Sequence, residues 1–280
     1  MNLFQYVEQN YSKFTKREKL IADYLLLKER RILNMSAKEI SEITGTSAPT
    51  VVRFSKKLGF NSLNEMKLSL SISFENNKSD KKFEYLDEDL SVRNIINGIR
   101  QTFKNIVDVT SDLIKEDELE KAIEILINAK SIYIFGVGVS GIVGLDFYYK
   151  LSRIGKRCVY HNDAHLQVTS SVLIEKDDVA LVISYSGETR EVILCAENIK
   201  KNNVKLISIT KASIDNKLSN ISDITLNVPY VEKSLREGAI SSRISQLAII
   251  DMLFIGMAKN NLKDIEDKLV ITRNAVSELK

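Results

Sequence analysis

Three hydroxyl side chains lie close together in the segment VISYSGET, which ends at Thr189. Ser184, Ser186 and Thr189 surround Gly187, and the apolar run before them is typical of a buried strand that ends here. Hydroxyl groups and the backbone N–H groups around a glycine can together surround one phosphate. Arg190 is the only basic residue beside the loop, so neutral donors and a helix dipole would hold the anion. The alternative is a polar loop that caps a helix.

A second candidate loop is rich in glycine and follows another apolar run, in the segment IFGVGVS that ends at Ser140. Gly136 and Gly138 permit a tight turn, and the start of the following helix offers free N–H groups to an anion. With Gly141 the spacing also fits the dinucleotide-binding pattern GxGxxG. That pattern needs an acidic residue at the end of the next strand, about 20 residues on, and Asp163 lies too far along to fit it well.

Short apolar runs rich in Val and Ile alternate with helical patterns after about residue 131. Such runs are typical of strands buried on both faces of a parallel sheet. The predicted strands are 132–137, 156–160, 179–184, 204–209 and 224–228. The predicted helices are 91–113, 115–129, 140–154, 164–173, 189–202 and 236–259. We therefore expect a three-layer α/β domain with both candidate loops at the ends of strands.

The N-terminal part differs, because its apolar residues recur at helical spacing. Two segments, TKRE from Thr15 and SAKE from Ser36, have the spacing of capping boxes. Gly45 then supplies a turn, and Ser47 can cap a further helix that runs to Leu58. Two short helices joined by a tight turn that contains glycine form a helix-turn-helix, so an all-α domain is predicted here.

The second of these helices has the two faces expected of a helix that reads the major groove. Its predicted apolar residues are Val51, Val52, Phe54 and Leu58. We predict Ser47, Thr50 and Arg53 to lie nearest to the bases, and Lys56 and Lys57 to contact phosphates. The alternative is an ordinary helical hairpin with a solvated basic face.

The most hydrophilic stretch, ENNKSDKK at 75–82, has no apolar residue to order it by burial. We interpret it as part of a linker at 76–88, between a helix-turn-helix domain at 1–75 and a second domain at 89–280. Residues 1–74 carry 12 Lys and Arg against 7 Asp and Glu, a net charge of +5, whereas the rest is slightly acidic. A basic N-terminal domain suits nucleic acid, although so small an excess also arises by chance.

The segment SAKEISEITGTSAPTVVRFSKKLGFNSLNEMK resembles the N-terminal domain of the RpiR family of bacterial transcriptional regulators. Most of the likeness lies in TVVRFSKKLGF and in a following helix that begins near Ser62. GVGVS and ISYSGET together resemble the sugar isomerase (SIS) domain over about residues 120–260. The segment from Ser241 to Phe254 resembles the final helix of that domain in RpiR-type regulators. One departure is Gly144, where the family pattern suggests alanine.

The resemblance implies which residues meet a ligand. Those implied to bind its phosphate are Ser140, Ser184, Ser186 and Thr189, to which we add the backbone at Gly187. His165 follows the second strand, where related domains reach the sugar, and we predict that it bonds to a sugar hydroxyl; a structural histidine is the alternative. In isomerases with this domain, a glutamate near the position of Glu237 acts as the catalytic base. Glu237 would therefore contact the ligand or simply favour a helix N-terminus.

The cysteines and histidines are too few for a disulfide framework or a metal site. Cys158 and Cys195 lie in apolar segments and are predicted to be buried thiols. His161 and His165 would supply only two ligands, so no metal and no cofactor is predicted. No signal peptide is recognisable and no stretch approaches the ~18 apolar residues of a membrane span. The expectation is a cytoplasmic protein without membrane contact.

We therefore expect a transcriptional regulator without catalytic residues that controls sugar catabolism genes. It would bind a double-stranded DNA operator as a homodimer or homotetramer and respond to a phosphosugar effector, within the family an amino-sugar 6-phosphate. The alternative is a sugar-phosphate isomerase or etherase with Glu237 and His165 as an acid–base pair. A nucleotide-binding oxidoreductase rests on the glycine pattern alone.

Overall fold

The computed structural model describes residues 3–27, 29–67, 69–70, 91–213, 216–229 and 238–277. The chain forms two compact units. The expected pairing of an all-α N-terminal domain with a parallel α/β domain is confirmed. The predicted linker at 76–88 lies outside the described residues, as does Glu237.

The N-terminal domain is built from short helices around one apolar core. Its elements are α1 (Leu3–Gln9), η1 (Tyr11–Lys13), α2 (Lys16–Leu26), η2 (Arg30–Asn34), α3 (Ala37–Thr44) and α4 (Ala48–Lys57), followed by helical residues at 63–67. Both predicted capping boxes are present, because the side chains of Thr15 and Ser36 each accept a hydrogen bond from the backbone N–H three residues later. Phe4, Ile21 and Phe54 are among the side chains buried in the core.

The turn between α3 and α4 forms as the sequence indicates. Gly45 ends α3 in the left-handed conformation, with φ of 64°, and Ser47 caps α4 by accepting from the Thr50 N–H. Val51 and Phe54 are buried, as predicted. Val52 is only partly buried, which corrects its assignment to the apolar face.

The second domain holds a five-stranded parallel sheet. Its strands are β1 (Ile132–Phe135), β2 (Cys158–Tyr160), β3 (Val179–Ile183), β4 (Lys205–Lys211) and β5 (Ile224–Val228), in the order β2-β1-β3-β4-β5. The helices of this domain are α7 (Glu116–Asn128), α8 (Val139–Arg153), α9 (Ala164–Leu173), α10 (Arg190–Lys201), α11 (Lys217–Ile221), α12 (Ile240–Lys259) and α13 (Leu262–Ser277). A further helix, α6 (Val92–Leu113), belongs to the first compact unit up to Val109. All five predicted strands are found, whereas α1, α11 and α13 were not predicted.

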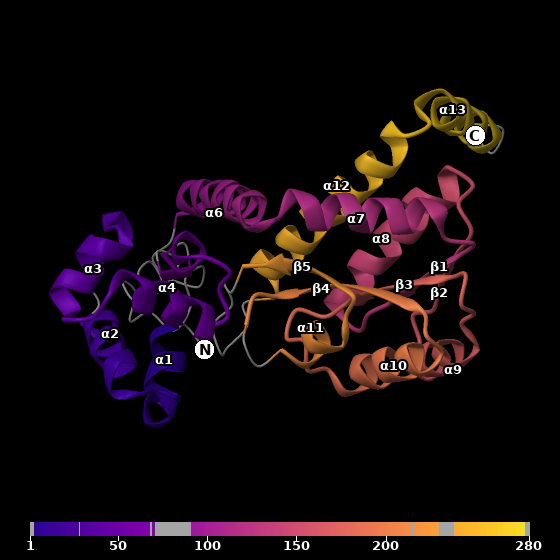
Figure 1. Ribbon diagram of the computed structural model, residues 1–280. Helices are drawn as coiled ribbons and strands as arrows, with labels where there is room; N and C mark the ends of the chain where they lie inside the picture. Colours follow the sequence, from indigo (N-terminus) through magenta and orange to yellow (C-terminus); the bar gives the residue numbers. More distant parts are fainter. Residues whose placement is uncertain are drawn as a thin grey trace. The chain divides into compact units, whose positions relative to one another are not determined.

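The sheet is buried on both faces, and alternate residues of each strand point to opposite cores. Ile132 and Ile134 of β1 join the core beneath α7, α8 and α12, whereas Phe135 joins the core beneath α9, α10 and α11. Figure 1 shows these two helical layers on the two sides of the sheet. The arrangement follows from right-handed crossovers: β1 to β2 runs in one direction along the sheet and the later connections in the other, so their helices lie on opposite faces.

The helix α12 is apolar along most of its length. Within the described ranges it is the one helix long and apolar enough to cross a membrane by length and composition alone. Its Ile249, Ile250 and Leu253 are fully buried in the core between the sheet, α7 and α8. Eight residues of α12 are buried, whereas Ile255 is 64% exposed, so the helix packs into the domain core along one side.

Gly144, the departure from the family pattern, lies where α8 crosses β1. A Cβ atom at this position would come within 2.9 Å of Cγ2 of Ile134. Glycine therefore lets α8 approach the sheet more closely than alanine would.

The two cysteines provide a test of this packing. Burial raises the pKa of Cys195 to about 11, so about one thiol in a thousand is ionised at pH 8, and the thiolate is the reactive form. Cys158 is half-buried and burial raises its pKa too. We expect iodoacetamide to modify Cys158 before Cys195 in the native protein and both in urea, as followed by mass spectrometry. Equal native rates would contradict the described packing.

Candidate functional site

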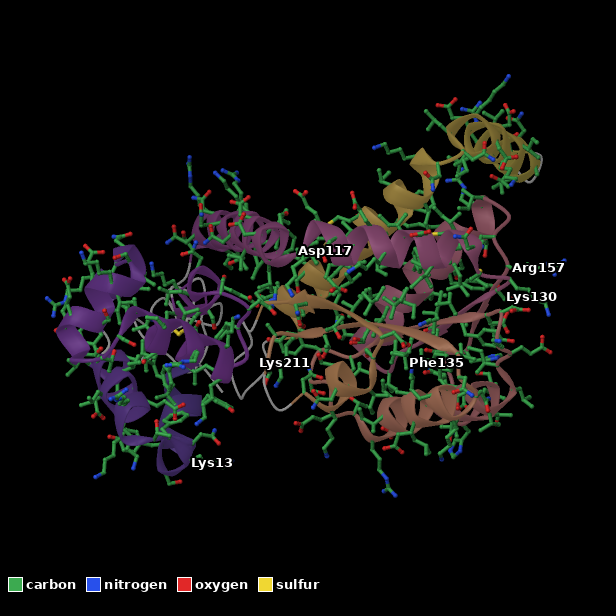
Figure 2. All side chains as sticks on the ribbon, viewed as in Figure 1. Lys13, Asp117, Lys130, Phe135, Arg157 and Lys211 are labelled. Atoms are coloured by element: carbon green, nitrogen blue, oxygen red, sulfur yellow. The ribbon has the colours of Figure 1, made fainter. Side chains whose placement is uncertain are left out.

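The order of the strands places both candidate loops at one point of the sheet. The chain leaves β1 towards β2 on one side, and leaves β3 towards β4 on the other. Ligands of open parallel sheets bind in the crevice at the carboxyl ends of the strands where the connections diverge in this way. In Figure 2, Lys211 marks the carboxyl edge of the sheet, and Lys130 and Arg157, which precede β1 and β2, mark the opposite edge. The loops after β1 and β3 flank the divergence point.

The loop after β3 brings the three predicted hydroxyl groups together. The hydroxyl of Thr189 lies 3.2 Å from that of Ser184 and 3.4 Å from that of Ser186. The Ser184 hydroxyl also accepts from the Gly187 N–H, and the Ser186 hydroxyl accepts from the Glu188 N–H. The cluster therefore sits immediately before α10, where the helix dipole favours negative charge.

Gly187 is required by both its backbone and its surroundings. Its φ is +68°, and a Cβ atom would lie 1.9 Å from Oδ1 of Asn216. Asn216 is buried, donates to the hydroxyl of Thr210 and to the carbonyl of Lys211, and caps α11. The Gly187 carbonyl accepts from the N–H of Leu218. The loop is thus held against β4 and α11 by bonds that the sequence alone did not indicate.

The glycine loop after β1 is held by a buried glutamine. Gln167 of α9 is 2% exposed, and its side-chain amide exchanges two hydrogen bonds with the backbone of Gly136, at 3.0 and 2.9 Å. The same Nε2 donates to the carbonyl of His161, just after β2. The side chain of Gln167 therefore links the residue that follows β1 to the residue that follows β2 by hydrogen bonds to their backbones.

The last predicted residue of this loop contacts a second buried glutamine. The hydroxyl of Ser140 lies 3.2 Å from Nε2 and 3.4 Å from Oε1 of Gln246, which α12 contributes. Ser140 itself is half-buried in the first turn of α8. Gln167 and Gln246 thus hold the two ends of the loop, and neither was among the predicted site residues.

The end of β2 differs from what a dinucleotide needs. Asp163, the nearest acidic residue, caps α9 by accepting from the Leu166 N–H. The hydroxyl of Tyr160 donates to the carbonyl of Gly141, and burial raises the pKa of this tyrosine. Since both groups are used within the domain, they give no support to a ribose site.

The remaining predicted sugar contact, His165, lies in the first turn of α9 and is exposed. Arg190 is likewise exposed, at the first residue of α10. Among the described residues, no group of three or more His, Cys, Asp or Glu side chains is arranged to hold a metal ion. The groups that the two candidate loops could offer to a ligand are hydroxyls, amides and backbone N–H groups.

Four of the five predicted DNA contacts of α4 are exposed, namely Ser47, Arg53, Lys56 and Lys57. Thr50 differs, since it is only 7% exposed. Its hydroxyl pairs with that of Ser47 at 2.8 Å and accepts from Nη2 of Arg53 at 3.4 Å. Thr50 is thus placed to orient its two neighbours.

Lys57 also has a partner within the domain. Its Nζ lies 2.7 Å from a carboxylate oxygen of Glu18, the capping-box residue of α2, and 5.7 Å from the ring centre of Phe14. The attraction of Lys57 helps to lower the pKa of Glu18, although partial burial opposes it. Lys57 consequently ties α4 to α2, although its side chain, like that of Lys56, is exposed.

Comparison with known proteins identifies both domains. Residues 1–77 match the helix-turn-helix domain of the rpiR family, and residues 125–256 match the SIS domain. An uncharacterized HTH-type transcriptional regulator of Caldanaerobacter subterraneus is 35% identical over 97% of this chain and 95% of its own. A regulator of Clostridium perfringens is 33% identical over 99% of both chains.

The chain belongs to the RpiR family of transcriptional regulators. The NanR protein of Vibrio vulnificus, whose structure holds ManNAc-6P, superposes with a TM-score of 0.64 at 26% identity, over 100% of this chain and 99% of its own. The sugar isomerase domain of an RpiR transcription factor from Sphaerobacter thermophilus shares the fold, with a TM-score of 0.57 at 16% identity over 64% of this chain and 98% of its own. The predicted regulator with a SIS domain is thus confirmed.

For this RpiR-family regulator, the two glycines Gly187 and Gly155 offer a matched test of the site. Both have φ close to +69°, but a Cβ atom at Gly155 would meet only the Lys268 side chain, at 3.8 Å. We expect Gly155→Ala to cost about 1–2 kcal/mol of unfolding free energy for the left-handed backbone alone. Gly187→Ala should cost a further 1–3 kcal/mol or so, because Asn216 must move.

Urea denaturation of the two variants measures this difference. Equal losses of stability would show that Asn216 does not confine Gly187.

Proposed function

We propose that the SIS domain of this regulator binds a phosphosugar effector at the carboxyl ends of β1 and β3. The hydroxyl cluster of Ser184, Ser186 and Thr189 carries the proposal, because it lies before a helix at the divergence point of the sheet. Backbone N–H groups at Gly187 and the hydroxyl of Ser140 would complete the phosphate site. ManNAc-6P bound to NanR supports an amino-sugar 6-phosphate as the effector.

The sugar would extend from this site towards groups outside the two loops. His165 and Glu237 remain the proposed sugar contacts, His165 because it follows β2, the strand next to β1. An exposed imidazole can donate to or accept from a sugar hydroxyl. We propose a binding role and no catalytic one, in keeping with relatives that are transcriptional regulators.

The N-terminal domain would contact operator DNA through α4. Arg53 and Ser47 are proposed to reach base edges and Lys56 a phosphate, since each of these residues is exposed. Thr50 would act mainly by holding Arg53, and Lys57 is the weakest of the proposed phosphate contacts because Glu18 neutralises it.

The active assembly would be a homodimer or homotetramer. Helix-turn-helix readers bind paired half-sites about one DNA turn apart, which needs at least two recognition helices. Such a regulator would work in the cytoplasm and control sugar catabolism genes. The effector would change the operator affinity by no more than the ratio of its own affinities for the two conformational states of the protein.

Removal of one hydroxyl tests the phosphate site. We expect Ser184→Ala to weaken ManNAc-6P binding tenfold or more, roughly the loss of one hydrogen bond to a charged group. Thermal shift and calorimetry measure the effect, and Ser152→Ala, at the far end of α8, is the control with the same atom removed. An unchanged affinity in Ser184→Ala would contradict the assigned loop.

Removal of Arg53 tests the DNA site. We expect Arg53→Ala to weaken binding about ten- to hundredfold, the range for a base contact, on a fragment that the protein selects from random DNA. Arg157→Ala removes the same charge from the α/β domain and serves as the control. Fluorescence anisotropy at physiological salt measures both, and equal affinities would remove α4 from the interface.

A further inference from the structure

The side-chain amide of Gln246 is buried beside the proposed phosphate site. Gln246 is 1% exposed, and in the described part of the chain the hydroxyl of Ser140 is the partner of both its Nε2 and its Oε1. A carboxamide can donate two hydrogen bonds and accept two, so one hydroxyl uses little of this capacity. The group is therefore more polar than its present contacts within the domain require.

The buried side of α12 is polar at its N-terminal end, near the glycine loop after β1, and apolar further along. The buried side of the helix begins with Ser242, Ser245 and Gln246 and continues with Ile249 and Leu253. Apolar residues fill such a position with less loss of hydration than a carboxamide. The polar stretch thus coincides with the level at which α12 passes Ser140.

The two distances from Gln246 to Ser140 correspond to two opposite hydrogen bonds. In one, Nε2 donates to the hydroxyl oxygen, and the hydroxyl hydrogen is free to point elsewhere. In the other, the hydroxyl donates to Oε1 and its hydrogen is used. A phosphate dianion only accepts hydrogen bonds, so the first arrangement alone lets Ser140 donate to it.

We propose that Gln246 is a positioning residue of the effector site. Its amide donates to the Ser140 hydroxyl and directs the hydroxyl hydrogen towards the phosphate of the ligand. Donation to an oxygen also makes that hydroxyl a stronger donor, because linked hydrogen bonds polarise one another. The inference rests on the proposed phosphosugar function and adds a residue from α12, which no sequence motif of the two loops contains.

Two substitutions of similar size separate positioning from packing. Gln246→Glu keeps the shape but offers an acceptor and a negative charge, so it would take the Ser140 hydrogen and repel the phosphate. Gln246→Met keeps the volume and offers neither. At pH 8 we expect about tenfold weaker ManNAc-6P binding for Gln246→Met and at least about a hundredfold for Gln246→Glu.

The pH dependence gives a readout that packing would not move. Protonation restores a donor to the carboxyl of Gln246→Glu, so its affinity relative to wild type should recover as the pH falls from 8 to about 5.5. The ratio to wild type removes the titration of the phosphate itself, and the ratio for Gln246→Met should stay constant. Calorimetry on the full chain, repeated with inorganic phosphate, measures these affinities.

Each outcome bears on one claim. Equal affinities for the two variants at pH 8 would overturn the positioning role, while wild-type binding would leave the phosphosugar function standing. Failure of wild type to bind ManNAc-6P, related sugar phosphates and inorganic phosphate would overturn the proposed function and this inference with it. Where Gln246→Glu does not fold, a double-mutant cycle of Gln246→Met with Ser140→Ala decides: additive effects overturn the proposal.

Discussion

The reversal of direction at β1 is the constraint on which the proposed effector site depends. The connection from β1 to β2 runs in the opposite direction along the sheet to the later connections. Because the crossovers are right-handed, α8 lies on one face of the sheet and α9, α10 and α11 lie on the other. Loops that leave for opposite faces cannot close over the strand ends between them. The glycine loop and the hydroxyl loop are the two sides of that opening, and each precedes a helix whose N-terminus faces it.

Such a site would hold an anion by preorganisation. Hydroxyl groups and N–H groups carry no net charge, so they compete with water only if they are fixed before the ligand arrives. The structure supplies that fixing from outside the loops, with Gln167 pairing with the Gly136 backbone and Asn216 confining Gly187. A residue that never meets the ligand can therefore contribute to its affinity, because it removes the cost of ordering those that do.

The extent of sequence-based prediction follows the range of the interactions involved. Features that depend on residues close together in the sequence could be predicted. They include the capping boxes at Thr15 and Ser36, the turn at Gly45 and the five strands. Partners far apart in the chain could not. The pairing of Lys57 with Glu18 is an example, since 39 residues separate two charges that each look suited to solvent or to DNA.

The same limit explains the two glutamines. In sequence, Gln167 and Gln246 are polar positions of helices that read as amphipathic or apolar, with no spacing that distinguishes them from solvent-facing residues. Their amides become informative only when α9 and α12 lie against β1 and α8, 31 and 106 residues away along the chain. Burial of Thr50 is of this kind too, because it depends on how deeply α4 packs into the domain.

The contacts of α12 restrict how an effector could act on this regulator. Besides the bond between Gln246 and Ser140, Lys150 of α8 pairs with Asp146 and, at 3.0 Å, with Asp251 of α12. Asp251 follows Gln246 by little more than one helical turn, so two separate bonds tie α8 to α12. A ligand changes a protein only by binding two arrangements unequally. A phosphate bound at Ser140 would favour the arrangement in which α8 and α12 remain joined, because Gln246 can position the Ser140 hydroxyl only in that arrangement.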